Sequence, residues 1–128
     1  MVWYLDSSAF LKLIVLEQET PALRAWIAGV APCWSSQLLR TEALRAAQRL
    51  GVDERAVTDA LDTVSLVAPG SSTFLIAGRL KLPALRSLDA LHLATALEIG
   101  NDLEGLVTYD ARMVGGARTA SIAVLSPR

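Results

Sequence analysis

The sequence predicts one α/β domain over residues 1–128, with a mainly parallel central sheet of about four to five short strands flanked by helices. Short apolar runs alternate with longer stretches whose apolar residues have helical spacing, which is typical of parallel sheets. The length of 128 residues suffices for one hydrophobic core and is too short for two. Hydrophobic residues make up 52% of the chain and charged residues 20%, which excludes a disordered protein.

The first half of the chain is predicted to hold two strands and four helices. Pro21 suits a first helical turn with Thr20 as its N-cap, and Gly51 suits a helix end. In chain order we expect a strand at Val2–Leu5, helices at residues 7 to about 17 and 20–28, a strand at residues 32–35, a helix capped by Ser36 that runs to Leu50, and a helix capped by Asp53 that runs to about Thr63.

The second half is predicted to hold three strands and three helices. Ser87 suits the N-cap of an almost wholly apolar helix that stops at Gly100, and the pair Gly115 and Gly116 is expected to end a short helix. In chain order we expect a strand at residues 64–68, helices at residues 71–82 and 88–99, a strand at residues 105–109, a helix at residues 110–114 and a strand at residues 121–125.

Composition narrows the class of protein. The net charge of −1 and the pI near 5.8 argue against a protein that binds nucleic acid by bulk charge. Local attraction of a nucleic acid is still possible, because residues 67–88 lack acids and carry Arg79, Lys81 and Arg86. These three residues equally suit a solvated helix end and loop. No apolar run approaches the ~18 residues that span a bilayer, and the N-terminus lacks the pattern of a secretory signal. Cys33 is the single cysteine, so we expect a cytosolic protein without an internal disulfide or a membrane partner.

Four of the 13 acidic residues do not lie where a solvated acid is expected. Asp6 and Asp110 follow predicted strands directly, and ligands of parallel sheets bind beyond the carboxyl ends of the strands. Asp89 lies in the first turn of the apolar helix, and Glu42 lies among apolar residues of an earlier helix. Taken singly, helix capping explains Asp6 and Asp110, and a solvated face explains Glu42.

Taken together, the four carboxylates would repel one another unless they share a proton or a cation. Hard oxygen ligands without clustered histidine or cysteine suit Mg²⁺ or Mn²⁺ and argue against zinc. A site of this kind can serve phosphodiester hydrolysis by a metal-activated water, without a side-chain nucleophile.

Several neighbouring residues have both a functional and an ordinary interpretation. Ser8 and Thr108 could hydrogen-bond a carboxylate, or be simple helix and strand residues. Arg112 could reach the scissile phosphate, or form a surface pair with an acid. His92 is interpreted as a buried structural histidine, and Cys33 as a small buried hydrophobe rather than a nucleophile.

Four motifs resemble those of PIN-domain ribonucleases, specifically the VapC toxins of VapBC toxin–antitoxin systems. Residues 4–9 (YLDSSA) with 11–13 (LKL) look like that family's acidic first strand and first helix, and residues 35–45 (SSQLLRTEALR) are similar to its second motif. Residues 87–96 (SLDALHLATA) are the most specific match, and residues 107–113 (VTYDARM) resemble the closing motif. The four matches follow the family order and cover nearly the whole chain.

The resemblance implies a PIN-like fold in which Asp6, Glu42, Asp89 and Asp110 hold Mg²⁺ or Mn²⁺. It also implies RNA cleavage that inhibits translation, homodimerisation, and neutralisation by an antitoxin protein. Many family members place a further carboxylate near the last motif, where this chain has Val107, so we expect one tightly held ion. The mean hydropathy of +0.39 suggests apolar surface for a partner, and the helices at residues 9–16 and 22–30 could form a groove for an antitoxin helix.

Two other functions compete with this one. The first is a catalytically inactive module of the same fold that binds RNA or protein, which the intact set of four acids disfavours. The second is a phospho-acceptor signalling domain, which usually needs adjacent acids on the first strand and a late lysine. Asp6 is flanked by Leu5 and Ser7, and no lysine follows Lys81, so this function ranks last.

Overall fold

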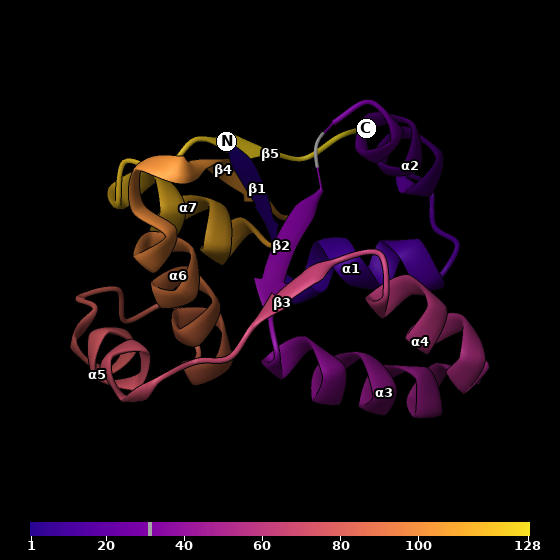
Figure 1. Ribbon diagram of the computed structural model, residues 1–128, viewed down its shortest axis with the longest axis horizontal. Coiled ribbons are helices and arrows are strands. Elements are labelled where there is room, and N and C mark those ends of the chain that lie inside the picture. The colour runs from indigo at the N-terminus through magenta and orange to yellow at the C-terminus, as the bar shows by residue number, and fades with distance from the viewer. Residues whose placement is uncertain (31) are drawn as a thin grey trace.

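Five strands form one sheet in the computed structural model, which describes residues 1–30 and 32–128 (Figure 1). The strands are β1 (Val2–Leu5), β2 (Cys33–Ser36), β3 (Ser65–Val67), β4 (Leu103–Val107) and β5 (Val124–Leu125). Their order across the sheet is β3-β2-β1-β4-β5, and every neighbouring pair is parallel. The predicted α/β class is therefore confirmed, and all carboxyl ends of the strands lie along one edge of the sheet.

Seven α-helices connect these strands within the same described residues. They are α1 (Ser7–Ile14), α2 (Thr20–Ala28), α3 (Leu38–Leu50), α4 (Glu54–Leu61), α5 (Ser71–Arg79), α6 (Ser87–Ile99) and α7 (Ala111–Thr119), with a short 3₁₀ turn at Gly100–Asp102. None of the helices in this part of the chain has the length and apolar character that a bilayer crossing requires.

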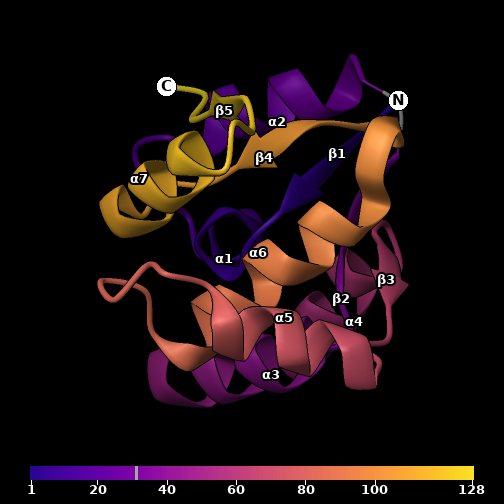
Figure 2. The ribbon, with the colours of Figure 1, turned by 90° about the vertical axis from the view of Figure 1, so that its left-hand side faces the viewer.

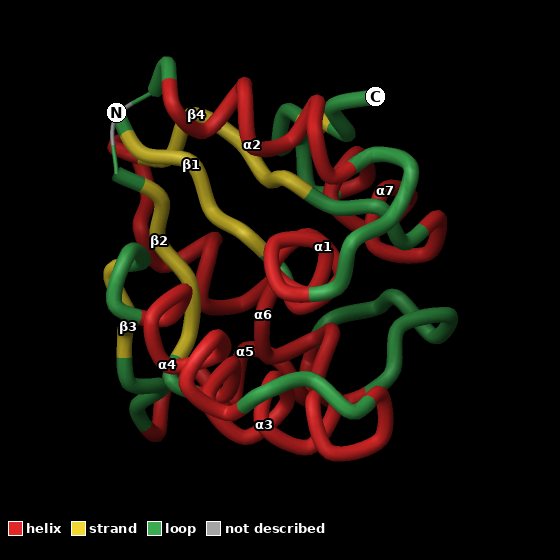
Figure 3. Tube along the Cα trace, turned by 90° about the vertical axis from the view of Figure 1, so that its right-hand side faces the viewer, coloured by secondary structure: helices red, strands yellow, loops and turns green. Residues whose placement is uncertain are grey.

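The helices form two layers because neighbouring strand residues point to opposite faces of the sheet. Leu5 and Val107 belong to a core shared with α1, α2, α3 and α4, the side that faces the viewer in Figure 3. Tyr4 and Leu106 belong to a second core shared with α6 and α7. Figure 2 shows that second side, where α5 packs on the outer surface of α6.

Most differences from the predicted elements lie at helix ends. α1 ends at Ile14 rather than near residue 17, because Val15 is extended and the Thr20 hydroxyl donates to the Lys12 carbonyl at 2.8 Å. Thr20 is thus the first residue of α2 and Glu19 occupies the N-cap position, so the predicted Thr20 cap was wrong. Arg86 likewise precedes α6 in place of Ser87. The Asp53 cap and the left-handed Gly51 (φ 70°) are confirmed.

The last helix is longer than predicted. Gly115 and Gly116 lie inside α7, which continues to Thr119. Gly116 is buried, and a Cβ there would lie 3.1 Å from Leu85 Cδ1, so close packing against the loop before α6 favours a glycine within the helix. Tertiary packing therefore overrides the usual role of glycine as a helix breaker, and β5 begins only at Val124.

Candidate active site

The carboxyl ends of β1 and β4 place Asp6 and Asp110 at neighbouring positions of the sheet edge. The two strands pair in parallel, with Leu5 opposite Val107, and the Asp6 amide donates to the Val107 carbonyl at 3.2 Å. Asp6 is the N-cap of α1 and Asp110 is the N-cap of α7. Asp6 and Asp110 therefore cap helices and also lie at the carboxyl ends of strands, so the capping role does not exclude a role in the site.

Asp6 is 2% exposed, and both of its carboxylate oxygens accept hydrogen bonds. Oδ1 accepts from the Ser8 hydroxyl at 2.6 Å and from the Ala9 amide at 3.0 Å. Oδ2 accepts from the Thr108 hydroxyl. Burial raises the pKa of Asp6, although the bonds from Ser8, Thr108 and Ala9 oppose the rise. The hydroxyls of Ser8 and Thr108 therefore donate to a carboxylate of the candidate site, as their functional interpretation from the sequence requires.

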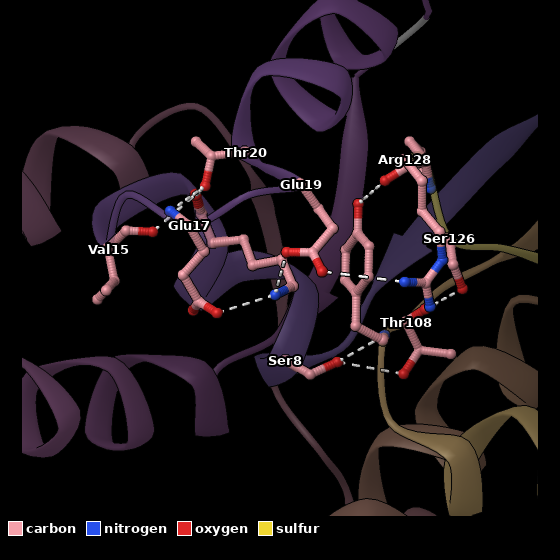
Figure 4. A network of polar contacts seen from close by, with 11 residues as sticks. Ser8, Val15, Glu17, Glu19, Thr20, Thr108, Ser126 and Arg128 are labelled. Carbon is pink, nitrogen blue, oxygen red and sulfur yellow. Dashed lines mark hydrogen bonds and ion pairs between the residues drawn. The ribbon is translucent and has the colours of Figure 1, made fainter.

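Ser8 and Thr108 also bind the backbone that follows β4. The Tyr109 amide donates to the Ser8 hydroxyl at 2.9 Å, and the Asp110 amide donates to the Thr108 hydroxyl at 3.1 Å. These bonds join the start of α1 to the segment that carries Asp110. Figure 4 shows Ser8 and Thr108 side by side between these two parts of the chain.

Glu42 is held by a buried hydrogen-bonded chain that crosses three elements. Glu42 of α3 lies 2.6 Å from Nε2 of His92 on α6, and Nδ1 of His92 lies 2.7 Å from the hydroxyl of Tyr4 on β1. His92 and Tyr4 are both 0% exposed, which confirms the predicted burial of His92. A carboxylate can only accept, so Nε2 carries the proton; in a neutral imidazole Nδ1 then accepts from the Tyr4 hydroxyl.

Asp89 and Asp110 complete the predicted set of acids. Burial raises the pKa of Asp89, and the negative charges of Asp110 and Glu42 raise it further. The Asp110 carboxylate accepts from the Arg112 amide at 2.8 Å, and the Arg112 guanidinium lies 4.0 Å from the same oxygen. Arg112 therefore pairs with an acid, in a partly exposed contact that contributes little to stability.

The donor atoms of these carboxylates suit a hard divalent cation, although the side chains do not form a complete set of ligands as they lie. Over residues 1–30 and 32–128, no three His, Cys, Asp or Glu side chains form a ready metal-binding group. In the same ranges, neither Asp6 nor Asp89 forms an ion pair with Lys, Arg or His. Partly buried carboxylates within reach of like charges, with oxygen as the only donor atom, suit Mg²⁺ or Mn²⁺.

A second polar network, which the sequence did not reveal, lies beside the site (Figure 4). Lys12 is 9% exposed and donates to Glu17 at 3.1 Å and Glu19 at 3.0 Å, although both acids were expected to be solvated. The Lys12 ammonium also lies 4.8 Å from the Tyr109 ring centroid. Apolar spacing within α1 gives no sign of this network, because its partners lie beyond the helix.

The C-terminal residues extend the same network. Arg128 lies 3.9 Å from Glu19, and the Tyr109 hydroxyl donates to the Pro127 carbonyl at 2.7 Å. The Ser126 hydroxyl donates to the Thr108 carbonyl at 2.5 Å. The segment between Thr108 and Asp110 is therefore bonded on one side to α1 and on the other to the end of the chain.

Comparison with known proteins agrees with this geometry. The family model described as the PIN domain matches residues 3–117. Ribonuclease VapC46 of Mycobacterium tuberculosis is 44% identical over 125 residues, covering 97% of this chain and 96% of the relative. Ribonuclease VapC47 of the same species is 37% identical over 133 residues, with the same coverage of both chains.

Two solved structures share the fold. The sarcin–ricin loop cleaving toxin VapC20 of M. tuberculosis superposes with a TM-score of 0.77 at 15% identity, covering 98% of this chain and 99% of that one. A toxin–antitoxin complex from Klebsiella pneumoniae contains a chain with a TM-score of 0.74 at 21% identity, covering 98% and 97%. With the family match and the identities to ribonucleases over nearly the whole length, the chain belongs to the PIN-domain family and, within it, to the VapC ribonucleases.

Proposed function

We propose that this chain is a metal-dependent endoribonuclease, the toxin of a type II toxin–antitoxin pair, which hydrolyses RNA phosphodiester bonds in the cytoplasm and thereby inhibits translation. The observation that carries the proposal is a convergence of acids from four elements. Asp6 and Asp110 follow the paired strands β1 and β4, and Glu42 lies 2.6 Å from His92, which is one helical turn after Asp89 on α6. The identity to curated VapC ribonucleases supports the same activity.

Asp6, Glu42, Asp89 and Asp110 are the residues that would hold Mg²⁺ or Mn²⁺, and we expect one tightly held ion. When bound, the cation supplies the charge that activates a water and neutralises the phosphodiester. Ser8 and Thr108 hold the Asp6 carboxylate, and His92 holds that of Glu42. The chain thus contributes carboxylates whose orientation is fixed by hydrogen bonds from neighbouring side chains, of which Thr108 and His92 are fully buried.

An antitoxin protein and a second copy of the chain are the proposed partners. An apolar hollow of about 240 Å³ lies between α1, α2 and the start of β2, lined by Leu13, Ile27, Val30, Pro32 and Cys33 among others. This hollow supports the predicted groove for an amphipathic antitoxin helix. Co-expression with the protein encoded beside the toxin should yield a complex, and isolation of the toxin alone would contradict the pairing.

The decisive experiment is cleavage of total cellular RNA by the purified chain with Mg²⁺ or Mn²⁺. We expect discrete cuts that EDTA abolishes, and we expect Asp89→Asn to lose at least a hundredfold in rate. Asp102→Asn makes the same chemical change at an exposed position outside the site and should keep full activity. No cutting by folded, metal-supplied wild-type chain would favour the inactive binding module instead.

A further inference from the structure

A hollow of about 330 Å³ opens directly beside Glu42, between α1, α3 and the start of α6. Its base is apolar, and its lining also holds the charged residues of α3 and two hydroxyls. The lining residues are Leu11, Ala46 and Leu88, with Glu42, Arg45, Arg49, Ser7 and Thr41. Positions 42, 45 and 49 follow the i, i+3, i+7 spacing of one helix face, so the candidate acid and both arginines point to the same side of α3. The hollow therefore adjoins the candidate active site and carries two positive side chains.

The two arginines have no structural partner that accounts for them. Both are exposed, and among the described residues neither forms an ion pair. Glu42 is the acid nearest to Arg45 in sequence, and its Oε1 lies 2.6 Å from His92. Asp53 is the acid nearest to Arg49 in sequence, and its side chain accepts from the Arg55 amide at 3.3 Å. Arg112 and Arg128 differ, since each lies near a carboxylate. The chain has a net charge of −1, so two uncompensated cations beside an acidic site are a local feature that attracts anions.

We propose that this hollow binds the RNA backbone next to the scissile phosphate, with Arg45 and Arg49 each contacting a phosphate. Four residues of helix rise about 6 Å, so the two guanidinium groups can reach different phosphates of one strand. A guanidinium pairs with phosphate oxygens through two parallel hydrogen bonds, and backbone contacts of this kind position a strand without reading its sequence. This inference rests on the proposed ribonuclease function and adds where the substrate lies.

RNA is favoured over an acidic protein segment because the hollow shares Glu42 with the candidate active site. A strand that passes this site to be cut must continue on one side of it, and α3 offers positive charge there. The hydroxyls of Ser7 and Thr41 add donors suited to phosphate oxygens or a ribose 2′-OH.

The test measures binding without cleavage. A fluorescein-labelled single-stranded RNA of about 20 uridines is titrated with the chain in EDTA, over a range of salt concentrations, and followed by anisotropy. We expect Arg45→Ala/Arg49→Ala to weaken binding at least tenfold at about 50 mM salt. We also expect the slope of log K against log salt to become shallower by about 1.4, at about 0.7 for each lost phosphate contact.

The matched control removes the same charge elsewhere. Arg55→Ala/Arg118→Ala changes two exposed arginines of α4 and α7 that do not line the hollow, and it should leave affinity and slope nearly unchanged. Equal melting temperatures of the two double variants would exclude misfolding as the cause of a difference. Equal losses of RNA affinity in both would overturn the proposal, because they would indicate bulk charge alone.

Two further outcomes would also overturn it. The first is no measurable RNA binding by the wild-type chain at about 50 mM salt, where phosphate contacts are strongest. The second is loss of poly-L-glutamate binding, with RNA binding unchanged, in Arg45→Ala/Arg49→Ala, which would assign the hollow to an acidic protein segment. Asp89→Asn separates this proposal from the proposed catalysis, since it should stop cleavage yet keep the salt-dependent binding.

Discussion

Single side chains in this protein act through partners that lie far away in the sequence. The hydroxyl of Thr108 holds Asp6 across 102 residues, and His92 holds Glu42 across 50. The sequence predicts the four acids because Asp6 and Asp110 follow strands, while Asp89 and Glu42 lie among apolar residues of helices. It does not predict which donor serves which acid, because hydrogen-bond partners on different elements leave no periodic signal.

Tyr4→Phe tests whether the chain from Tyr4 through His92 to Glu42 positions the acid. The ring packs in the core at 0% exposure, so the fold should persist, at a cost of about 1–3 kcal/mol for the unpartnered His92 nitrogen. We expect cleavage to fall about 10- to 100-fold, mainly in kcat, because Glu42 loses its fixed orientation.

The readout that separates positioning from simple destabilisation is nitrogen NMR of the imidazole. The chain contains one histidine, so its signals need no assignment by mutation. In the wild type we expect the proton on Nε2 and an unprotonated Nδ1 that accepts from Tyr4. In Tyr4→Phe the Glu42 carboxylate keeps the proton on Nε2, and we expect the Nδ1 signal to move because that nitrogen loses its hydrogen bond. Unchanged imidazole signals together with unchanged kcat would reject the positioning role.

At the level of elements, the order of strands and helices follows from the sequence while several boundaries do not. Apolar runs predict all five strands, because buried parallel strands are apolar on both faces. The extension of α7 through Gly115 and Gly116 was missed, because the packing of Gly116 against Leu85 is a contact between elements. The early end of α1 was missed because the Thr20 hydroxyl binds the Lys12 carbonyl from outside that helix.

Gly105→Ala tests how tightly β4 packs against its neighbours. A Cβ at Gly105 would lie 2.5 Å from Trp3 Cζ3 and 2.8 Å from the Ala123 carbonyl oxygen, so the Trp3 ring and the backbone before β5 must move. We expect a loss of about 1–3 kcal/mol in the free energy of unfolding, measured by urea denaturation.

Gly115→Ala provides the contrast within the same chain. No atom lies within 4 Å of its added Cβ, and the residue is helical, so the substitution should stabilise the protein by up to about 1 kcal/mol. Equal effects of the two substitutions would mean that the close approach of Trp3 to Gly105 has no energetic consequence.

At the scale of the whole molecule, the network around Lys12 connects parts of the chain that the sheet alone does not join. It links α1, the segment before α2, the strand-end residue Tyr109 and the C-terminal Arg128 (Figure 4). Burial lowers the pKa of Lys12, yet the hydrogen bonds to Glu19 and Glu17 outweigh this effect and raise it overall. Hydrogen bonding to Lys12 in turn lowers the pKa of Glu19.

Lys12→Met tests this connection, because methionine keeps an unbranched apolar side chain at this buried position and removes the charge. At neutral pH we expect the melting temperature to fall by a few degrees, since Glu17 and Glu19 lose their cation. Glu19 has a lowered pKa in the folded state, so its contribution to stability is present above its ordinary pKa and lost as the pH falls through the lowered value. The difference between variant and wild type should therefore shrink in acid.

Thermal unfolding followed by circular dichroism at neutral pH and in acid measures this difference. Arg55→Met is the control, since it breaks an exposed pair with Asp59 that spans 4.0 Å and should change the melting temperature little at any pH. A loss in Lys12→Met that stays constant from neutral to acid pH would point to the contact of the Lys12 ammonium with the Tyr109 ring, because neither group titrates in that range. A loss that fades in acid would mean that the ion pairs of Lys12 with Glu17 and Glu19 join α1 to the segment before α2.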